Sequence, residues 1–169
     1  MTYLIDSSCF MTASQTTNPI DIAESFWNKI AELANSHKFF SIDRVQTEIN
    51  QNIDELANWC NDNLPEDFFI STETPEVYEK FAELVNWAQD KVVNEGLKQS
   101  GVDKFIAADK ADIYLVAFTS LNPEEYTVVT EEKSSPFAKK DIKLPNACAA
   151  HHVKCINFMT MLREMKVKF

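Results

Sequence analysis

Apolar residues occur along the chain in two patterns, short unbroken runs and stripes at helical spacing. The unbroken runs are rich in aromatic and β-branched residues, which favour buried strands. They are Tyr3–Ile5, Phe39–Ile42, Tyr126–Thr130 and Val153–Ile156. We therefore expect strands distributed along the whole chain, separated by segments of a different secondary structure.

The stripes repeat every three or four residues, and most follow a capping residue, which predicts amphipathic helices. These helices are expected to begin at Asn18-Pro19, Asp43, Thr74-Pro75, Val102 and Asn157. The first stripe consists of Ile22, Phe26, Ile30 and Leu33, and the second of Val45, Ile49, Ile53 and Leu56. A polar segment over 58–65 is expected to end the second helix.

The later helices have clear ends. The third is expected to run to Val92, with Gly96 and Gly101 bracketing its exit, because glycine commonly ends helices. The fourth is expected to run from Val102 to Thr119, and the last ends near Met165. The basic segment 133–145 predicts a loop.

Strands that alternate with helices predict one α/β domain over residues 1–169. We expect a three-layer α/β/α architecture around a central, mostly parallel sheet of four to five strands. In such folds the ligand site lies outside the carboxyl ends of the strands. Asp6 directly follows the first strand, so we expect it at that edge.

Composition narrows the function classes. A hydrophobic content of 45% supports a buried core, and the 2 glycines match neither a GxGxxG nor a P-loop pattern. The net charge is −10, yet the charged residues within 133–169 are mainly basic. An acidic body suits a cation and a basic tail suits a polyanion, although the tail could equally be a solvated surface.

The chain shows no long apolar stretch and no secretory signal, so no membrane attachment is expected. Its four cysteines lack CxxC spacing, which favours free thiols and a cytoplasmic location.

Acidic residues recur where strands are expected to end. They are Asp6, Glu48, Asp112 and the pair Glu131 and Glu132. Asp112 is the most informative, because its apolar neighbours predict burial, and a buried charge is costly unless it is paired or binds a metal. Asp109 lies one turn earlier and could replace it.

Gathered carboxylates repel one another, and their pKa values rise unless a cation lies among them. Carboxylate oxygens suit Mg²⁺ or Mn²⁺. The sequence therefore predicts a divalent-metal site, although each acid alone could be a helix cap or a solvated side chain.

Four motifs, in this order and spacing, resemble the successive motifs of the PIN-domain nucleases. They read "YLIDSS", "VQTEI", "ADIYLVAFT" and "YTVVTEE". The match is closest to a PIN-like subfamily that has "IPDVC" followed by a "V-x-C-I-N" strand, where this chain has "LPNAC" and "VKCIN". The resemblance runs from Tyr3 to Phe169.

The resemblance implies a metal-dependent endoribonuclease like the VapC-type toxins of type II toxin–antitoxin pairs. The implied metal-binding and catalytic acids are Asp6, Glu48, Asp112 and Glu132, with Glu131 as the alternative to Glu132. Ser8 and Thr130 would orient Asp6 or water. Asn146 occupies the subfamily's last acidic position, and Glu replaces the common Asp after the fourth strand, so a single metal ion is plausible.

The resemblance also implies partners. The basic loop residues Lys133, Lys139, Lys140 and Lys143 would grip the RNA substrate. A cognate antitoxin, for this subfamily one with a helix-turn-helix domain, would restrain the enzyme, and homodimers are common among PIN nucleases.

Other functions remain open from the residues alone. The chain could be a non-catalytic PIN-like interaction module, or an aspartyl phosphatase in which Ser8 replaces the usual second Asp. The segment "CAAHHVKC" offers Cys148, His151, His152 and Cys155 as zinc ligands, and Cys9 is a candidate thiol nucleophile.

Overall fold

The four apolar runs predicted as strands all lie in one sheet of the computed structural model, which describes residues 2–51, 54–107 and 109–168. Within these residues the sheet has five parallel strands in the order β3-β2-β1-β4-β5. The strands are β1 (Thr2–Ile5), β2 (Phe39–Ile42), β3 (Phe69–Ile70), β4 (Tyr126–Val129) and β5 (Lys154–Ile156). The two-residue strand β3 was not predicted.

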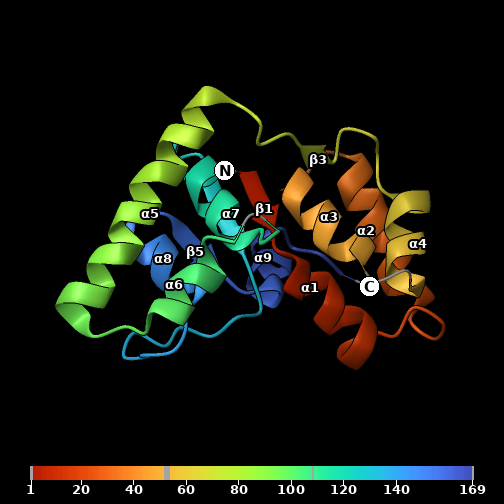
Figure 1. The fold of residues 1–169 in the computed structure, drawn as a ribbon. Helices are drawn as coiled ribbons and strands as arrows, with labels where there is room; N and C mark the ends of the chain where they lie inside the picture. Colours follow the sequence, from red (N-terminus) through yellow and green to blue (C-terminus); the bar gives the residue numbers. More distant parts are fainter. Residues whose placement is uncertain (1, 52–53, 108, 169) are drawn as a thin grey trace.

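Helices flank this sheet and complete the predicted three-layer α/β/α fold. They are α1 (Ser7–Thr12), the π-helix η1 (Ala13–Thr17), α2 (Glu24–Asn35), α3 (Asp43–Gln51), α4 (Glu55–Asn63), α5 (Pro75–Glu95), α6 (Gln99–Phe105), α7 (Asp112–Thr119), α8 (Leu144–Ala150) and α9 (Phe158–Glu164). In Figure 1, helices α5, α6, α7 and α8 gather on one side of β1, and α2, α3 and α4 gather on the other. Among the helices described, none is long and apolar enough to span a bilayer.

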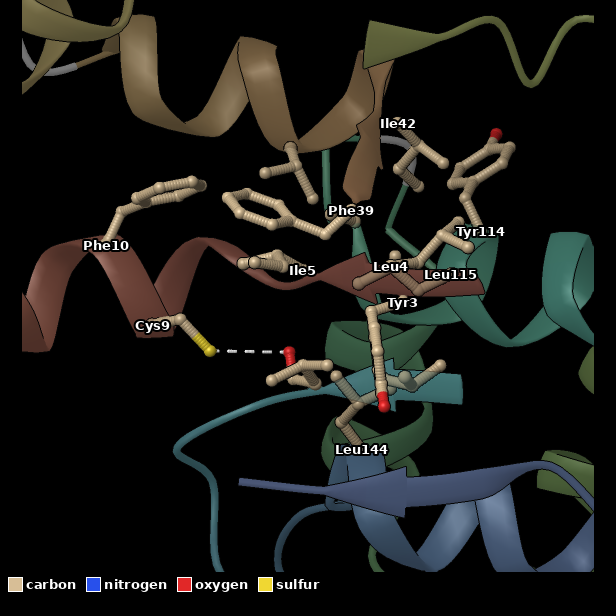
Figure 2. Close-up of a cluster of buried hydrophobic side chains, with 14 of the residues drawn as sticks. Tyr3, Leu4, Ile5, Cys9, Phe10, Phe39, Ile42, Tyr114, Leu115 and Leu144 are labelled. Carbon is tan, nitrogen blue, oxygen red and sulfur yellow. Dashed lines mark hydrogen bonds between the residues drawn. The ribbon is translucent and has the colours of Figure 1, made fainter. Parts of the chain in front are cut away.

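Strand β1 is the centre of the sheet and of the core. Leu4 and Ile5 have no exposed surface, because β1 pairs with β2 on one edge and β4 on the other while helices cover its faces. Phe39 and Ile42 of β2 pack beside them (Figure 2). This packing fixes the direction in which β1 delivers the residue that follows it, Asp6.

Two predicted helix starts are confirmed in atomic detail. The Thr74 side chain accepts a hydrogen bond from the Val77 N–H, and Pro75 is the first residue of α5. Gly96 ends α5 with a φ of 69°, a conformation that glycine adopts without strain. The Asn157 side chain caps α9 by accepting from the Thr160 N–H at 2.8 Å.

The predicted start of the first helix at Asn18-Pro19 is wrong, although the helix itself is present as α2, with Phe26, Ile30 and Leu33 buried. The chain is already helical after β1, through α1 and η1, and the Asn18 N–H closes η1 by donating to the Ala13 carbonyl. Helix α2 then begins only at Glu24, and Ile22 is 77% exposed rather than on an inner face. Asn18 therefore ends one helix instead of starting another.

The second predicted helix is two helices. Helix α3 ends at Gln51, and α4 begins at Glu55 because the Asp54 side chain accepts from the Ala57 N–H at 3.0 Å. Residues 58–63, expected to break the helix, belong to α4, and Ile53 lies outside the described residues. Asp43 is not a cap, since its carboxylate accepts hydrogen bonds from the Thr72 N–H and hydroxyl, just past β3.

The predicted helix over 102–119 is also divided, into α6 and α7. Gly101 lies inside α6 rather than at a helix exit, and a Cβ there would overlap the Lys140 carbonyl. The basic loop is therefore seated directly on α6. It is shorter than predicted, because α8, which was not predicted, begins at Leu144 with Pro145 in its first turn.

Gly101→Ala should destabilise the fold, because the new methyl group forces the loop backbone at Lys140 away from α6. Overpacking of this kind costs about 1–3 kcal/mol, and each kcal/mol lowers the Tm of a chain this size by about 2–4 °C. Thermal unfolding followed by circular dichroism measures this. The exposed neighbour Ser100→Ala is the control, and an equal Tm for both variants would contradict the close approach.

Candidate functional site

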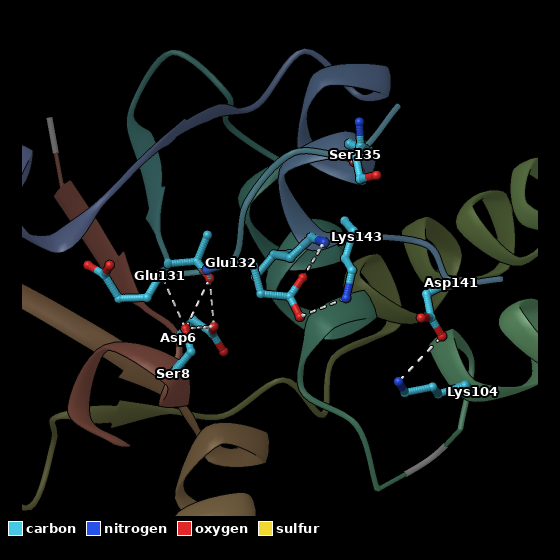
Figure 3. Close-up of polar contacts among 11 residues, drawn as sticks. Asp6, Ser8, Lys104, Glu131, Glu132, Ser135, Asp141 and Lys143 are labelled. Carbon is cyan, nitrogen blue, oxygen red and sulfur yellow. Dashed lines mark hydrogen bonds and ion pairs between the residues drawn. The ribbon is translucent and has the colours of Figure 1, made fainter. Parts of the chain in front are cut away.

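Asp6 occupies the carboxyl end of the central strand and is only 3% exposed. Its N–H donates to the Val129 carbonyl at 2.9 Å, which continues the pairing of β1 with β4. Its Oδ2 accepts hydrogen bonds from the hydroxyls of Ser8 and Thr130, at 2.5 and 2.8 Å (Figure 3). A buried carboxylate is thus held in one orientation by two short polar side chains.

Ser8 and Thr130, predicted to orient Asp6, both contact it. Their hydroxyl oxygens also lie 3.1 Å apart, and the Ser8 oxygen accepts from the Glu131 N–H at 3.1 Å. The Thr130 oxygen accepts from the Glu132 N–H at 3.1 Å. These bonds tie the segment after β4 to the segment after β1.

Glu48 reaches the same edge from α3. Its Oε2 accepts from the Ser7 hydroxyl at 2.8 Å, and its Oε1 accepts from the Ala111 N–H at 2.9 Å. Ala111 immediately precedes Asp112, the first residue of α7. Glu48 therefore connects the start of α7 to the start of α1, and it positions the backbone beside Asp112.

The acids influence one another electrostatically. Burial raises the pKa of Asp112 well above its usual range, and the negative charges of Asp6, Glu132 and Glu48 raise it further. Burial also raises the pKa of Asp6, hydrogen bonds from Ser8 and Thr130 lower it, and the charges of Glu48 and Glu132 raise it. The structure thus brings the four predicted acids to one edge of the sheet.

Glu131 and Glu132 point to opposite sides of the chain (Figure 3). The Glu132 carboxylate accepts from the Leu144 N–H at 3.0 Å and lies 4.0 Å from the Lys143 amine. The Glu131 carboxylate instead accepts from the Phe158 N–H, at the start of α9. Of the two, Glu132 is therefore the one that faces the other acids.

Among the residues described, no group of three or more His, Cys, Asp or Glu side chains is close enough to hold a metal ion in this conformation. The hydrogen bonds explain the spacing. Glu48 is turned toward the backbone at Ala111, and Glu132 is turned toward the backbone at Leu144. The acids share an edge, but two of them are engaged by the polypeptide.

Two other predicted candidates make their contacts with residues outside the four acids. Asp109, the alternative to Asp112, is 60% exposed at its side chain and pairs with Lys110 at 3.9 Å. Asn146 accepts from the Ser135 N–H at 2.8 Å and donates to the Ser134 hydroxyl at 3.1 Å. Asn146 therefore anchors the basic loop.

The predicted RNA-binding lysines have different surroundings. Lys133 and Lys140 are exposed, and Lys139 bonds the Glu95 carbonyl at the end of α5. Lys143 faces Glu132 at the site.

Two lysines that the sequence analysis missed lie beside the acids. Lys104 and Lys110 line, with Lys143, a small pocket of about 40 Å³. Three acids also line it: Asp112, Glu132 and Asp141, and Asp141 pairs with Lys104 at 3.4 Å. We call this the lysine pocket. In the sequence the only sign of it is that Lys104 and Lys110 flank the segment leading to Asp112. Their approach to Lys143 depends on how the basic loop lies on α6.

His151 and Cys9, which the sequence offered as a zinc ligand and a nucleophile, are both held by contacts within the fold. The His151 ring packs edge-on against Trp87 with centroids 5.1 Å apart, and burial lowers its pKa. The Cys9 thiol donates to the Val129 carbonyl, and burial raises its pKa well above the usual range, so the nucleophilic thiolate is disfavoured. The four cysteines, all in the described part of the chain, are free thiols.

Comparison with known proteins gives one family. The model of a domain of unknown function, DUF4411, matches residues 3–169. No curated protein matches the chain.

Asp112→Asn should stabilise the protein at pH 7 when divalent cations are removed with EDTA. The pKa of Asp112 is raised on folding, so the folded state binds more protons above pH 3.8, and the free energy of unfolding falls as pH rises to the raised value. Each pKa unit corresponds to about 1.4 kcal/mol, or a Tm gain of roughly 3–6 °C. Thermal unfolding across pH measures it.

The stabilisation should shrink as the pH is lowered, and it should vanish below pH 3.8, where the carboxyl is protonated in both states. Asp109→Asn is the matched control, because that side chain is exposed and should leave the Tm nearly unchanged. A lower Tm for Asp112→Asn than for wild type at pH 7 would show that the carboxylate is not repelled by its neighbours.

Proposed function

The chain belongs to the DUF4411 family, and from the geometry of its acidic edge we propose that it is a metal-dependent endoribonuclease. The observation that carries this proposal is the meeting of Asp6, Glu48, Asp112 and Glu132 at the carboxyl end of a parallel sheet, next to the lysine pocket. Acids that can bind a cation beside lysines that can bind a phosphate suit metal-assisted phosphodiester hydrolysis.

The donor set fits Mg²⁺ or Mn²⁺. All four acids offer oxygen ligands. Burial, and then repulsion from the neighbouring acids, raises the pKa of Asp6 and of Asp112, and a cation would offset both effects. When bound, the cation supplies positive charge for the phosphoryl oxygens and makes water a better nucleophile. To bind the cation, Glu48 and Glu132 would have to turn from, or share with the cation, the oxygens that now accept from the Ala111 and Leu144 N–H groups.

The chain's own residues support the reaction in distinct ways. Ser8 and Thr130 stabilise the ionised form of Asp6 and fix its orientation. The lysine pocket attracts the phosphate. One carboxylate at this edge would accept a proton from the attacking water while the ribose oxygen leaves the phosphorus.

The choice of RNA as substrate, and the biological role, rest on the resemblance to the PIN-domain nucleases. By that resemblance the protein is the toxin of a type II toxin–antitoxin pair and acts in the cytoplasm. Its partner would be an antitoxin, with a helix-turn-helix domain in this subfamily, and it would form a homodimer. The free thiols are compatible with a reducing compartment.

Asp6→Asn should abolish RNA cleavage in Mg²⁺ or Mn²⁺, by at least about 10²-fold, because it removes a charged ligand at the centre of the site. Gel analysis of cleaved RNA, with EDTA as the metal-free reference, measures it. Asp109→Asn should retain wild-type activity. A wild-type protein that leaves every RNA intact at all cation concentrations would contradict the proposal.

The alternative is a non-catalytic interaction module, which the engaged positions of Glu48 and Glu132 favour. Expression in a bacterium separates the two functions. A nuclease toxin arrests growth, and the arrest disappears with Asp6→Asn. If the protein is an interaction module, cells expressing wild type and cells expressing Asp6→Asn grow equally well.

Alanine at Lys104, Lys110 and Lys143 together should raise KM for RNA and weaken its salt dependence, because phosphate contacts release counterions from the strand. Each lost contact reduces the slope of log binding constant against log salt by about 0.7 for single strands. Binding titrations in EDTA at several salt concentrations measure it. Lys29→Ala, on the remote helix α2, is the control, and an equal slope in both variants would exclude the lysine pocket as the phosphate site.

A further inference from the structure

A second hollow borders the acids, on the side away from the lysine pocket. It has a volume of about 380 Å³ and lies between the α1–η1 segment and the start of α9. Glu131 lines this hollow, whereas Glu132 lines the lysine pocket, and the two side chains point apart (Figure 3). We call it the apolar cavity.

The walls and the rim of the apolar cavity differ in chemistry. The walls are formed by Cys9, Ala13, Phe26, Phe158 and Met159. The Phe26 and Phe158 rings meet edge to face with centroids 6.2 Å apart, while Met159 is 48% exposed. The rim adds polar groups from Thr12, Thr17, Asn18 and Glu131. Apolar walls with a few polar groups, in a volume of this size, are typical of sites for small molecules.

The wall opposite α9 is held in place. The π-helix η1 carries Ala13 and Thr17 to the cavity, and π-helical turns occur often at functional sites. Its end is fixed because the Trp27 indole N–H donates to the Asn18 carbonyl at 2.7 Å. The cavity is therefore formed before any ligand enters.

The apolar cavity is joined to the acids by a short path. The Ser8 hydroxyl donates to Asp6, and its oxygen accepts from the N–H of Glu131. One residue thus links the centre of the acidic site to the cavity rim. A nucleotide has the same order of chemistry, with a charged phosphate separated from a flat apolar base by one sugar.

We propose that the apolar cavity binds one nucleobase of the nucleic-acid strand whose phosphate lies at the acids. This inference rests on the proposed ribonuclease function and adds to it the site that positions the strand. The aromatic walls stack on or abut the base, and the polar rim meets its ring-edge donors and acceptors. The strand then crosses the sheet edge from the lysine pocket to the apolar cavity.

Nucleotide binding in EDTA tests this without any cleavage. Saturation-transfer NMR with adenosine 5′-monophosphate should show contact through the base protons, and ribose 5-phosphate, which lacks the base, should bind about tenfold more weakly. Thr12→Trp and Met159→Trp fill the cavity from its rim and its exposed edge, and each should weaken nucleotide binding about tenfold. Val93→Trp, on the exposed face of α5, should not.

Circular dichroism checks that each variant is folded. If Thr12→Trp does not fold, Met159→Trp supplies the test, because Met159 is at an exposed position. Equal binding of the nucleotide to the filled variants and wild type overturns the inference. So does equal binding of ribose 5-phosphate and the nucleotide. Cleavage of RNA without base-dependent binding leaves the ribonuclease proposal and removes this one. If base-dependent binding is observed and is lost in the filled variants, but no RNA is cleaved, this inference stands and the ribonuclease proposal fails.

Discussion

The structure depends on a concentration of negative charge at the carboxyl end of its central strand. Asp6 is buried there, and the charges of Glu48 and Glu132 add to the cost of ionising it. Hydroxyl groups from Ser8 and Thr130 offset part of that cost, but they do not remove it, because the pKa of Asp6 stays raised. A fold that keeps such an arrangement retains an unfavourable interaction, and retained strain of this kind usually marks a functional site.

The same edge separates two kinds of surface. Adjacent residues after β4 diverge, so that Glu132 faces the lysine pocket and Glu131 faces the apolar cavity. Both side chains also accept hydrogen bonds from the backbone at helix starts, Glu132 at Leu144 and Glu131 at Phe158. The acids therefore have a structural role as well as a proposed chemical one. They join α8 and α9 to the sheet, and this couples the shape of the site to the packing of these helices.

Errors in predicting the elements arose where a distant contact decided the outcome. The cap at Thr74 was predicted correctly, because the Val77 N–H that it binds lies three residues away. Asp is a common capping residue, yet the Asp43 carboxylate instead accepts hydrogen bonds from Thr72, which is distant in sequence. Gly101 was expected to end a helix, but its role is to let the Lys140 backbone approach. Local patterns cannot distinguish these cases, since both readings use the same residue type.

The sequence by itself determined the α/β class, the four longer strands and the gathering of the acids at one sheet edge, because apolar runs and the parallel-sheet rule depend on local pattern and chirality. Only the tertiary structure decided that Glu132 rather than Glu131 faces the other acids and that Asn146 anchors a loop. It also decided that Lys104 and Lys110 line a pocket with Lys143. The reason is physical: side-chain direction and loop placement depend on packing between segments far apart in the chain, and no short stretch of sequence contains that information.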